Sequence, residues 1–362
     1  MCRYRQKRIF MEGPMESKKL PGKYGFNMLW MFSKGKNEFP FPVESKELDF
    51  IANEGFNFIR IPMDYRYWTD GFDYTHPKEA VLEQIDRYIE ECNSRGLHAC
   101  LNMHRVPGYC INRPETEKHN LWRDREAQDG FAFLWKMFAE RYKGISSSRL
   151  SFDLVNEPDS IFPTHPCTRA DHEQVIRRTV QEILVADPER QIVIDGFNGG
   201  HNPLPELADL GKEHGVIHSG RGYAPFPLTH HNAEWVRDRN PNAPMPSWPQ
   251  NTADGVWNID WLRHFYSGWV ELAQRRVPVH IGEFGCYNKV SNTVALPWFE
   301  DLLTVLNENQ WGYALWNFRG PFGIVEHGRP DTQYEDMSGF KVDRALLELL
   351  KSGAKEYGGS LF

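Results

Sequence analysis

Cysteine is scarce in this sequence, with six in 362 residues, and none of the six belongs to a Cys-x-x-Cys pair or a zinc-like spacing. The spacing predicts neither a structural zinc site nor a disulfide framework. We expect most of the cysteines to be buried small apolar residues or free thiols. Cys110 and Cys286 fall near predicted strand ends, where we expect them to line a site without acting in it.

Long apolar runs are also lacking. No stretch approaches the roughly 18 consecutive apolar residues of a membrane span, so no membrane partner is expected. The N-terminal segment is charged and has no apolar core of a secretory signal. As written, the sequence predicts a cytoplasmic protein, or a secreted one if a leader has been removed. Residues 1–20 are expected to be an extension, disordered or an over-extended reading of a gene that starts at Met15.

A strong charge of either sign is missing too, because the formal net charge is −7 and the isoelectric point is about 6.1. Nucleic acid selects basic surfaces, so it is not expected as a partner. Aromatic side chains, by contrast, are abundant, at 14% of residues with 12 tryptophans. Such richness suits a site that stacks flat apolar faces, sugar rings among them.

Strand-like and helix-like segments alternate along the whole chain. The expected strands are residues 25–30, 56–63, 98–104, 150–156, 191–197, 216–223, 277–284 and 312–318. The expected helices are residues 45–53, 78–94, 126–142, 170–186, 204–210, 259–275, 297–309 and 343–350. Alternation of this kind predicts a parallel sheet, and eight units predict a closed (β/α)8 TIM barrel of the α/β class.

A doubly wound open sheet is the competing arrangement. It is disfavoured because no glycine-rich phosphate loop follows the first strand. The sequence has no repeats, low-complexity tracts or linkers, so residues 21–362 are expected to form one domain. The longest irregular segment, residues 224–256, is rich in Pro, Asn, His and Trp, and so long a loop in a compact domain is usually functional.

Polar residues fall where several predicted strands end, which in a barrel is the face that carries reactive groups. Leu154-Val155-Asn156-Glu157-Pro158 is the clearest case, because the proline stops the strand directly after a carboxamide and a carboxylate. Glu283 ends a second β-rich run. The other strand-end candidates are Arg60, His104, Arg105, Arg221, Tyr223, Trp316 and Asn317.

Two carboxylates across one opening fit glycoside hydrolysis. One carboxyl must be protonated to give its proton to the leaving oxygen, and the other must be ionised to attack the anomeric carbon. Their environments must therefore separate their pKa values. Arg60 is placed in sequence to keep one of them ionised. No set of His, Asp and Glu with metal-ligand spacing stands out, so neither a metal nor a cofactor is expected.

Five stretches occur in the order Phe58-Ile59-Arg60-Ile61-Pro62, Asn102-Met103-His104, Leu154-Val155-Asn156-Glu157-Pro158, Ile281-Gly282-Glu283-Phe284-Gly285 and Leu315-Trp316-Asn317-Phe318. Together they resemble glycoside hydrolase family 5, the cellulase family of the 4/7 superfamily. The pairing of the third and fourth stretches is highly specific. Residues 104–109, His-Arg-Val-Pro-Gly-Tyr, further resemble a His-Gly-Ala-Pro-Gly stretch of exo-acting glucanases in that family.

The resemblance implies a retaining glycoside hydrolase of cellulase or endoglucanase type. It would cleave β-glycosidic bonds of plant-type polysaccharides or their oligosaccharides by double displacement. Glu157 would be the acid/base and Glu283 the nucleophile. The supporting residues that the resemblance implies are Asn156 for the sugar 2-hydroxyl, Arg60 and Tyr223 around the nucleophile, His104 in the same subsite and Trp316 as the stacking platform.

One position departs from the family pattern. The family usually carries His-x-Tyr at the end of the sixth strand, where this chain has Arg221-Gly222-Tyr223. Arginine is longer and permanently charged, so it should lower the pKa of the acid/base unless another group compensates. We hypothesise that Arg221 either reads a substrate hydroxyl or carboxylate, or pairs with a nearby acid.

The sugar, its linkage and the oligomeric state stay open at this point. The main alternative is an exo-acting glycosidase on short oligosaccharides, of β-glucosidase, exoglucanase, mannosidase, arabinofuranosidase or galactofuranosidase type. A non-catalytic carbohydrate-binding barrel and a metal-dependent barrel hydrolase are the others. Candidate further sugar platforms are Trp30, Trp68, Trp122, Trp248 and Trp257. The tryptophans expected in the core are Trp135, Trp261, Trp269, Trp298 and Trp311.

Overall fold

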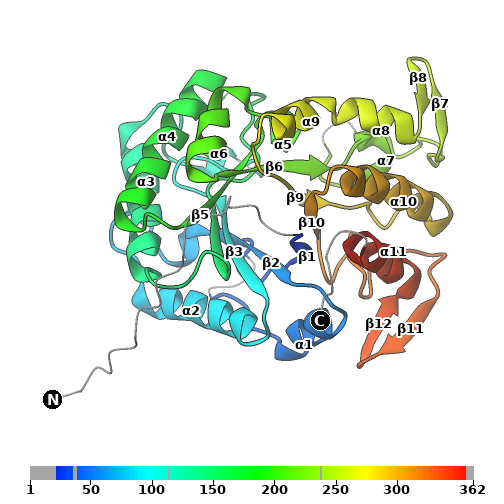
Figure 1. Cartoon of the computed structure of the whole chain (residues 1–362), viewed down its shortest axis with the longest axis horizontal. Coiled ribbons are helices and arrows are strands. Elements are labelled where there is room, and N and C mark those ends of the chain that lie inside the picture. Colours follow the sequence, from blue (N-terminus) through cyan, green and yellow to red (C-terminus); the bar gives the residue numbers. More distant parts are fainter. Residues whose placement is uncertain (1–21, 36–38, 113, 163, 237–238, 356–362) are drawn as a thin grey trace.

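The computed structural model describes residues 22–35, 39–112, 114–162, 164–236 and 239–355, and the expected extension at residues 1–20 lies outside them. Eight strands close into a parallel barrel in the order β1-β10-β9-β6-β5-β4-β3-β2 (Figure 1). They are β1 (Tyr24–Asn27), β2 (Phe58–Asp64), β3 (His98–Arg105), β4 (Leu150–Asp153), β5 (Gln191–Asp195), β6 (Ile217–Gly222), β9 (Val279–Phe284) and β10 (Gly312–Leu315). The predicted (β/α)8 barrel is confirmed.

Helices surround the barrel as predicted (Figure 1). The longer ones are α1 (Ser45–Asn53), α2 (Glu79–Ser94), α3 (Arg125–Arg141), α4 (Arg169–Ala186), α6 (Ala208–His214), α8 (Ile259–Phe265), α9 (Ser267–Gln274), α10 (Asn292–Glu308) and α11 (Arg344–Lys355). Short turns form η1 (Tyr65–Tyr67), η2 (Pro114–Thr116), α5 (Phe197–Gly200), η3 (Pro205–Leu207) and α7 (Phe226–Thr229). Helix α2 shows why they form, since Val81, Ile85 and Ile89 recur at helical spacing and are all buried. None of the helices in the described part of the chain is long and apolar enough to cross a bilayer.

Two hairpins were not predicted. The segment expected to be irregular contains β7 (Gln250–Thr252) paired with β8 (Gly255–Trp257), and β11 (Tyr334–Met337) pairs with β12 (Phe340–Asp343) before the last helix. The second turn consists of Ser338 and Gly339, both at positive φ. Two residues at positive φ make a type I′ hairpin turn, so the Ser-Gly pair was a usable signal.

Two helix predictions need correction. The helix expected over residues 259–275 is broken at Tyr266 into α8 and α9. Helix α10 begins at Asn292, not at Pro297, which lies inside it. Pro297 lies in the second turn of α10, where it removes one backbone hydrogen bond without ending the helix.

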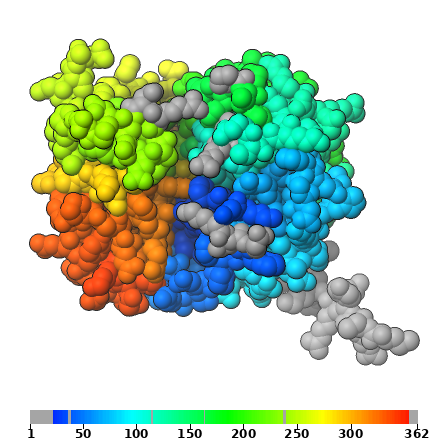
Figure 2. Space-filling view, turned by 180° about the vertical axis from the view of Figure 1, so that it is seen from behind, coloured from blue at the N-terminus to red at the C-terminus, as the bar shows by residue number. Residues whose placement is uncertain are grey.

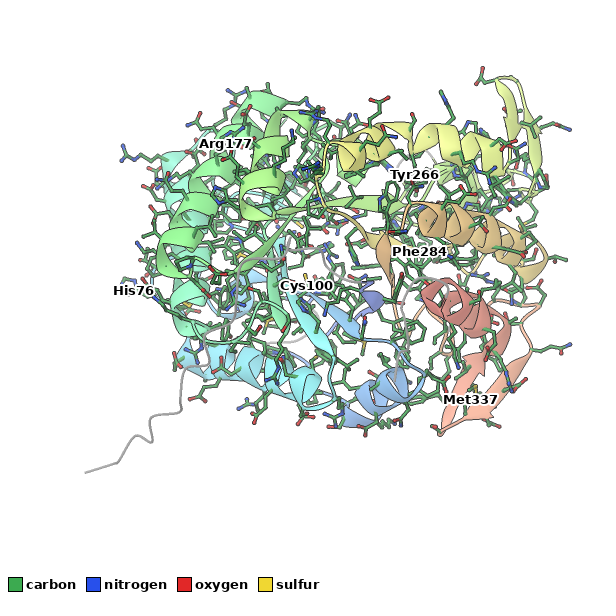
Figure 3. All side chains as sticks on the ribbon, in the orientation of Figure 1. His76, Cys100, Arg177, Tyr266, Phe284 and Met337 are labelled. Carbon is green, nitrogen blue, oxygen red and sulfur yellow. The ribbon has the colours of Figure 1, made fainter. Side chains whose placement is uncertain are left out.

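The barrel interior has an apolar layer below a polar one. Phe58, Cys100 and Ala314 belong to a cluster of inward-facing residues on the strands, and Figure 3 labels Cys100 at the centre of the molecule. Side chains alternate along a strand, so a residue two positions beyond Phe58 points the same way. That residue is Arg60, which is 1% exposed. The fold thus places a buried arginine above the apolar layer, at the carboxyl ends of the strands.

Candidate active site

Arg60 is the centre of a buried polar network. Its Nε donates to Asp153 Oδ2 at 2.7 Å, and its Nη2 donates to Asn156 Oδ1 at 2.9 Å. Its Nη1 donates to Asn27 Oδ1 at 2.9 Å and to Glu283 Oε1. The guanidinium therefore joins residues of β1, β2, β4 and β9 at the mouth of the barrel.

Glu283 is held on both carboxylate oxygens. Arg60 donates to Oε1, and the Tyr223 hydroxyl donates to Oε2 at 3.1 Å. An extra residue in β9 sets its direction, because Gly220 pairs with Ile281 while the next residue, Arg221, pairs with Glu283. Such a bulge turns the side chain that follows it. Both donors hold the Glu283 carboxyl group so that it points into the site.

Glu157 sits in a less common backbone conformation, with φ at 49°. Its backbone N–H donates to Asp195 Oδ2 at 3.0 Å, and the Tyr109 hydroxyl donates to its carbonyl at 2.7 Å. Positive φ is uncommon for a residue with a side chain and persists only where neighbours fix it. Here the two hydrogen bonds fix it, and the carboxyl group receives Arg221 Nε at 2.8 Å with 17% of the side chain exposed.

Burial and the neighbouring Glu283 raise the pKa of Glu157 to about 8, against the lowering effect of Arg221. The sequence predicted that the arginine would lower this pKa unless another group compensated. Glu283 and Asp195 are the compensating groups, since each favours the protonated form of Glu157. Burial, followed by Asp195, also raises the pKa of Asp153 to about 7 despite its contact with Arg60.

Arg221 is fully buried, and acids and carbonyls occupy its donors. Nε donates to Glu157 Oε1, Nη1 to Asp195 Oδ1 at 3.0 Å, and Nη2 to Asn156 Oδ1 at 2.9 Å. A second Nη2 bond goes to Asp195 Oδ2, and further Nη1 bonds reach Ser219 and Gly220. A guanidinium has five N–H groups. Arg221 pairs with the acids Glu157 and Asp195, as one of the two expectations held, and the other, that it reads a substrate group, stays a prediction.

The Tyr266 hydroxyl, from the break between α8 and α9, holds the backbone of Arg221 by a hydrogen bond. It donates to the Arg221 carbonyl at 2.9 Å, and Figure 3 labels it beside β6. The broken helix therefore has a structural use, because Tyr266 is buried under the strand that carries Arg221.

His104 and Trp316 form one wall of the site. Their rings stack with centroids 5.6 Å apart, and the half-buried Phe32 meets both edge-on. Burial lowers the pKa of His104 well below its ordinary value, with Arg60 and Arg221 acting in the same direction. His104 is therefore neutral, and its Nε2 lies 3.5 Å from Asn156 Nδ2.

The loops that bear these residues gather on the face shown in Figure 2, where the surface is hollowed between the dark blue and orange parts of the chain. A family model described as Cellulase (glycosyl hydrolase family 5) matches residues 22–320. The chain belongs to glycoside hydrolase family 5. It is therefore a hydrolase of glycosidic bonds, with carbohydrate as its substrate class.

Relatives in the family cover most of the barrel. Endoglucanase C of Acetivibrio thermocellus is 27% identical over 308 residues, which are 78% of this chain and 86% of that protein. Cellodextrinase A of Ruminococcus flavefaciens is 23% identical over 274 residues, 74% of this chain and 76% of that protein. A crystal structure described as a glycoside hydrolase is 54% identical, covers 92% of this chain and 99% of that one, and superposes with a TM-score of 0.87.

Four of the five tryptophans predicted as further sugar platforms in this family 5 barrel are core residues. Trp30 stacks on Tyr88, Trp68 packs on Phe138, and all four are at most 8% exposed. The four are Trp30, Trp68, Trp122 and Trp248. Trp257, the fifth, is half-buried against Trp261. The prediction failed for these four because aromatic residues in barrel-mouth loops can also pack beneath the surface, and for Trp257 it stays a prediction. The five tryptophans expected in the core do pack there, with Trp261 half-buried.

The sequence reasoning missed two residues of the buried network in this family 5 barrel. Asp195 and Asn27 end strands β5 and β1, and both are fully buried. Asp195 follows the apolar residues Ile192, Val193 and Ile194, which is the same signal that singled out Glu157. Outside this network, Trp235 is 57% exposed and meets Tyr287 edge-on at 4.9 Å.

Within the described ranges, no group of three or more His, Cys, Asp or Glu residues is placed to hold a metal ion. The five described cysteines are buried free thiols, including Cys110 and Cys286. Burial raises the pKa of the Cys286 thiol to about 12.

Proposed function

We propose that the chain is a retaining endo-acting glucanase that cleaves internal β-1,4 bonds of cellulose-type glucans. The observation that carries this proposal is the contrast between two carboxyl groups in one buried site. Glu157 has a pKa of about 8, and Glu283 accepts hydrogen bonds from a guanidinium and a phenol. A protonated acid beside an ionised nucleophile is what double displacement requires.

In the first step, Glu283 attacks the anomeric carbon while the bond to the leaving oxygen breaks. Glu157 gives its proton to that oxygen, and a glycosyl ester of Glu283 forms. In the second step, Glu157 takes a proton from water, and the resulting hydroxide displaces Glu283 from the same carbon. Two inversions at one carbon give net retention.

The neighbouring side chains orient the sugar in this proposal. Asn156 Oδ1 accepts from both Arg60 and Arg221, which fixes the amide and leaves Nδ2 as the group that donates to the sugar 2-hydroxyl. Trp316 is half-buried and offers its indole to the apolar face of the ring. Neutral His104 lines the same subsite.

The printed names of two relatives, an endoglucanase and a cellodextrinase, support a β-glucan substrate. Wild type should release a ladder of oligosaccharides from soluble β-1,4-glucan, and the initial products should keep the β configuration in proton NMR. Release of single sugars from chain ends alone would favour the exo-acting alternative. Mannosides, arabinofuranosides and galactofuranosides in the same screen test the other sugars.

Glu157→Gln and Glu283→Gln should each lose at least about a thousandfold in kcat/KM, because each removes a group that acts in both steps. Glu300→Gln, an exposed change on α10, is the matched control and should keep wild-type activity. Binding of glucan by a wild-type protein that hydrolyses no glycoside would contradict the proposal.

A further inference from the structure

Asp195 is a buried acid that touches both the side chain and the backbone around Glu157. It is 0% exposed and ends strand β5. Its Oδ1 accepts from Arg221 Nη1 at 3.0 Å, and its Oδ2 accepts from Arg221 Nη2 and from the backbone N–H of Glu157 at 3.0 Å. Arg60 Nη2 lies 3.8 Å from the same Oδ2.

We propose that Asp195 is a positioning residue that neutralises Arg221 and holds the Glu157 backbone, so that Glu157 can act as the acid although an arginine contacts its carboxyl group. The inference rests on the proposed role of Glu157 as the acid/base.

The first argument is the balance of charge. Two arginines, Arg60 and Arg221, face four acids in the site. The charged and titratable side chains around Glu157 are Arg60 on β2, His104 on β3, Tyr109 in the following loop, Asp153 on β4, Asp195 on β5, His201 after α5, Arg221 on β6, Tyr223 after β6 and Glu283 on β9. Burial keeps His104 and His201 neutral by lowering their pKa values, that of His201 to about 4, and it raises the pKa values of Tyr109 and Tyr223.

With the histidines and tyrosines neutral, Arg221 is the one cation bonded to the Glu157 carboxyl group in the described structure. An unpaired cation there would favour the carboxylate over the acid. The paired contact with Asp195 opposes that effect, because the two groups share two hydrogen bonds and both are fully buried. Asp195 therefore allows Arg221 to orient Glu157 without removing its proton.

The second argument is the backbone of Glu157. Its φ of 49° is disfavoured for a side-chain-bearing residue. The hydrogen bond from its N–H to Asp195 is one of two that fix this conformation. One carboxylate thus sets both the direction of Glu157 and the charge that it faces.

The test is the pH dependence of kcat/KM on an aryl β-cellobioside with a poor leaving group. Asp195→Asn should move the alkaline limb of this profile, the fall of kcat/KM at high pH, to lower pH by about one unit. Arg221→Gln should move it to higher pH, and the double variant should return it toward wild type. Asp209→Asn, which breaks an Arg–Asp pair on the surface with Arg177, is the matched control and should leave the limb unmoved.

A loss of activity in Asp195→Asn with an unmoved alkaline limb would mean that Asp195 is only structural, and would overturn the inference. If Asp195→Asn fails to fold, Arg221→Gln alone tests the inference. An alkaline limb that stays in place or moves to lower pH in Arg221→Gln would contradict the proposed charge balance. Failure of the proposed function gives a different result. In that case wild type is inactive, or Glu283→Gln keeps its activity, and the inference falls together with the proposal.

Discussion

Gly200 and Arg221 approach each other at a distance that only glycine allows. A Cβ on Gly200 would lie 2.5 Å from Arg221 Cγ, and Gly200 has φ at 80°. Gly200 belongs to the turn after β5, two residues of which also have positive φ. The turn therefore makes room for an arginine that is longer than the histidine usual in the family.

Gly200→Ala should lower kcat/KM at least about tenfold, because the methyl group must displace the arginine stem that orients Glu157. Gly199→Ala is the matched control. Gly199 also has positive φ, at 65°, but its nearest contact would be an ordinary 3.7 Å. Both variants carry backbone strain of about one kcal/mol, so only the clash separates them. Equal kinetics in the two variants would contradict this account.

The activity of wild type should fall as pH rises through about 8, because Glu157 must be protonated for the first step and its pKa is about 8. A glycoside with a strongly activated leaving group needs no proton on its leaving oxygen. Its glycosylation rate should therefore not fall as pH rises through about 8. The measurement is the pH profile of kcat/KM for the two substrates. The same alkaline limb on both would assign the titration to another group.

The raised pKa of Glu157 also makes stability depend on pH. The native state binds this proton more tightly than the unfolded chain, so the free energy of unfolding should fall as pH rises from about 4.5 to about 8. Glu157→Gln removes the titrating carboxyl group and, with it, this fall in the free energy of unfolding. The variant should therefore gain a few degrees in Tm relative to wild type at pH 8, and little at pH 4. Calorimetry at the two pH values checks the sign, and a larger gain at pH 4 would contradict it.

Arg60→Met should destabilise the fold strongly. The change leaves Asp153 and Glu283 buried without their cation, which costs about 3–5 kcal/mol for a buried pair. Arg263→Met is the matched control, since Arg263 pairs with Asp260 and Glu308 on the surface and its loss should change the free energy of unfolding little. Urea unfolding of both variants gives the comparison, and similar losses would contradict it.

Trp235 should bind sugar beyond the reacting ring. The hydroxyl of Tyr223 donates to Glu283, and its ring contacts Phe322 with centroids 6.1 Å apart. Phe322 in turn contacts Trp235, with centroids 6.0 Å apart. Trp235→Ala should raise KM for cello-oligosaccharides several-fold and leave KM for an aryl glucoside near wild type. Phe133→Ala, at an exposed aromatic on α3, is the control. An equal effect on short and long substrates would contradict the assignment.

Local pattern predicted the barrel well, and the reasons can be traced to particular elements. Helix α1 was expected at residues 45–53 and is found there, because its apolar residues recur at helical spacing. The strand ends were less accurate. The strand expected over residues 150–156 ends at Asp153, beyond which Leu154 and Asn156 donate single backbone hydrogen bonds to Val193 and Met103 of the neighbouring strands. Hairpin β11–β12 was missed because its strands are short and mostly polar.

The sequence by itself determined the fold class, the family resemblance and the two glutamates, because periodicity and strand-end carboxylates are properties of local order. Only the tertiary structure decided how those glutamates are tuned. Asp195 and Arg221 lie on strands β5 and β6 and Glu157 follows β4, and no sequence spacing shows that one carboxylate accepts from both other residues. The same holds for the tryptophans, since a position in a barrel-mouth loop does not say whether the side chain is covered. Electrostatic balance and burial depend on every group within a few ångströms, and the closed barrel alone assembles those groups.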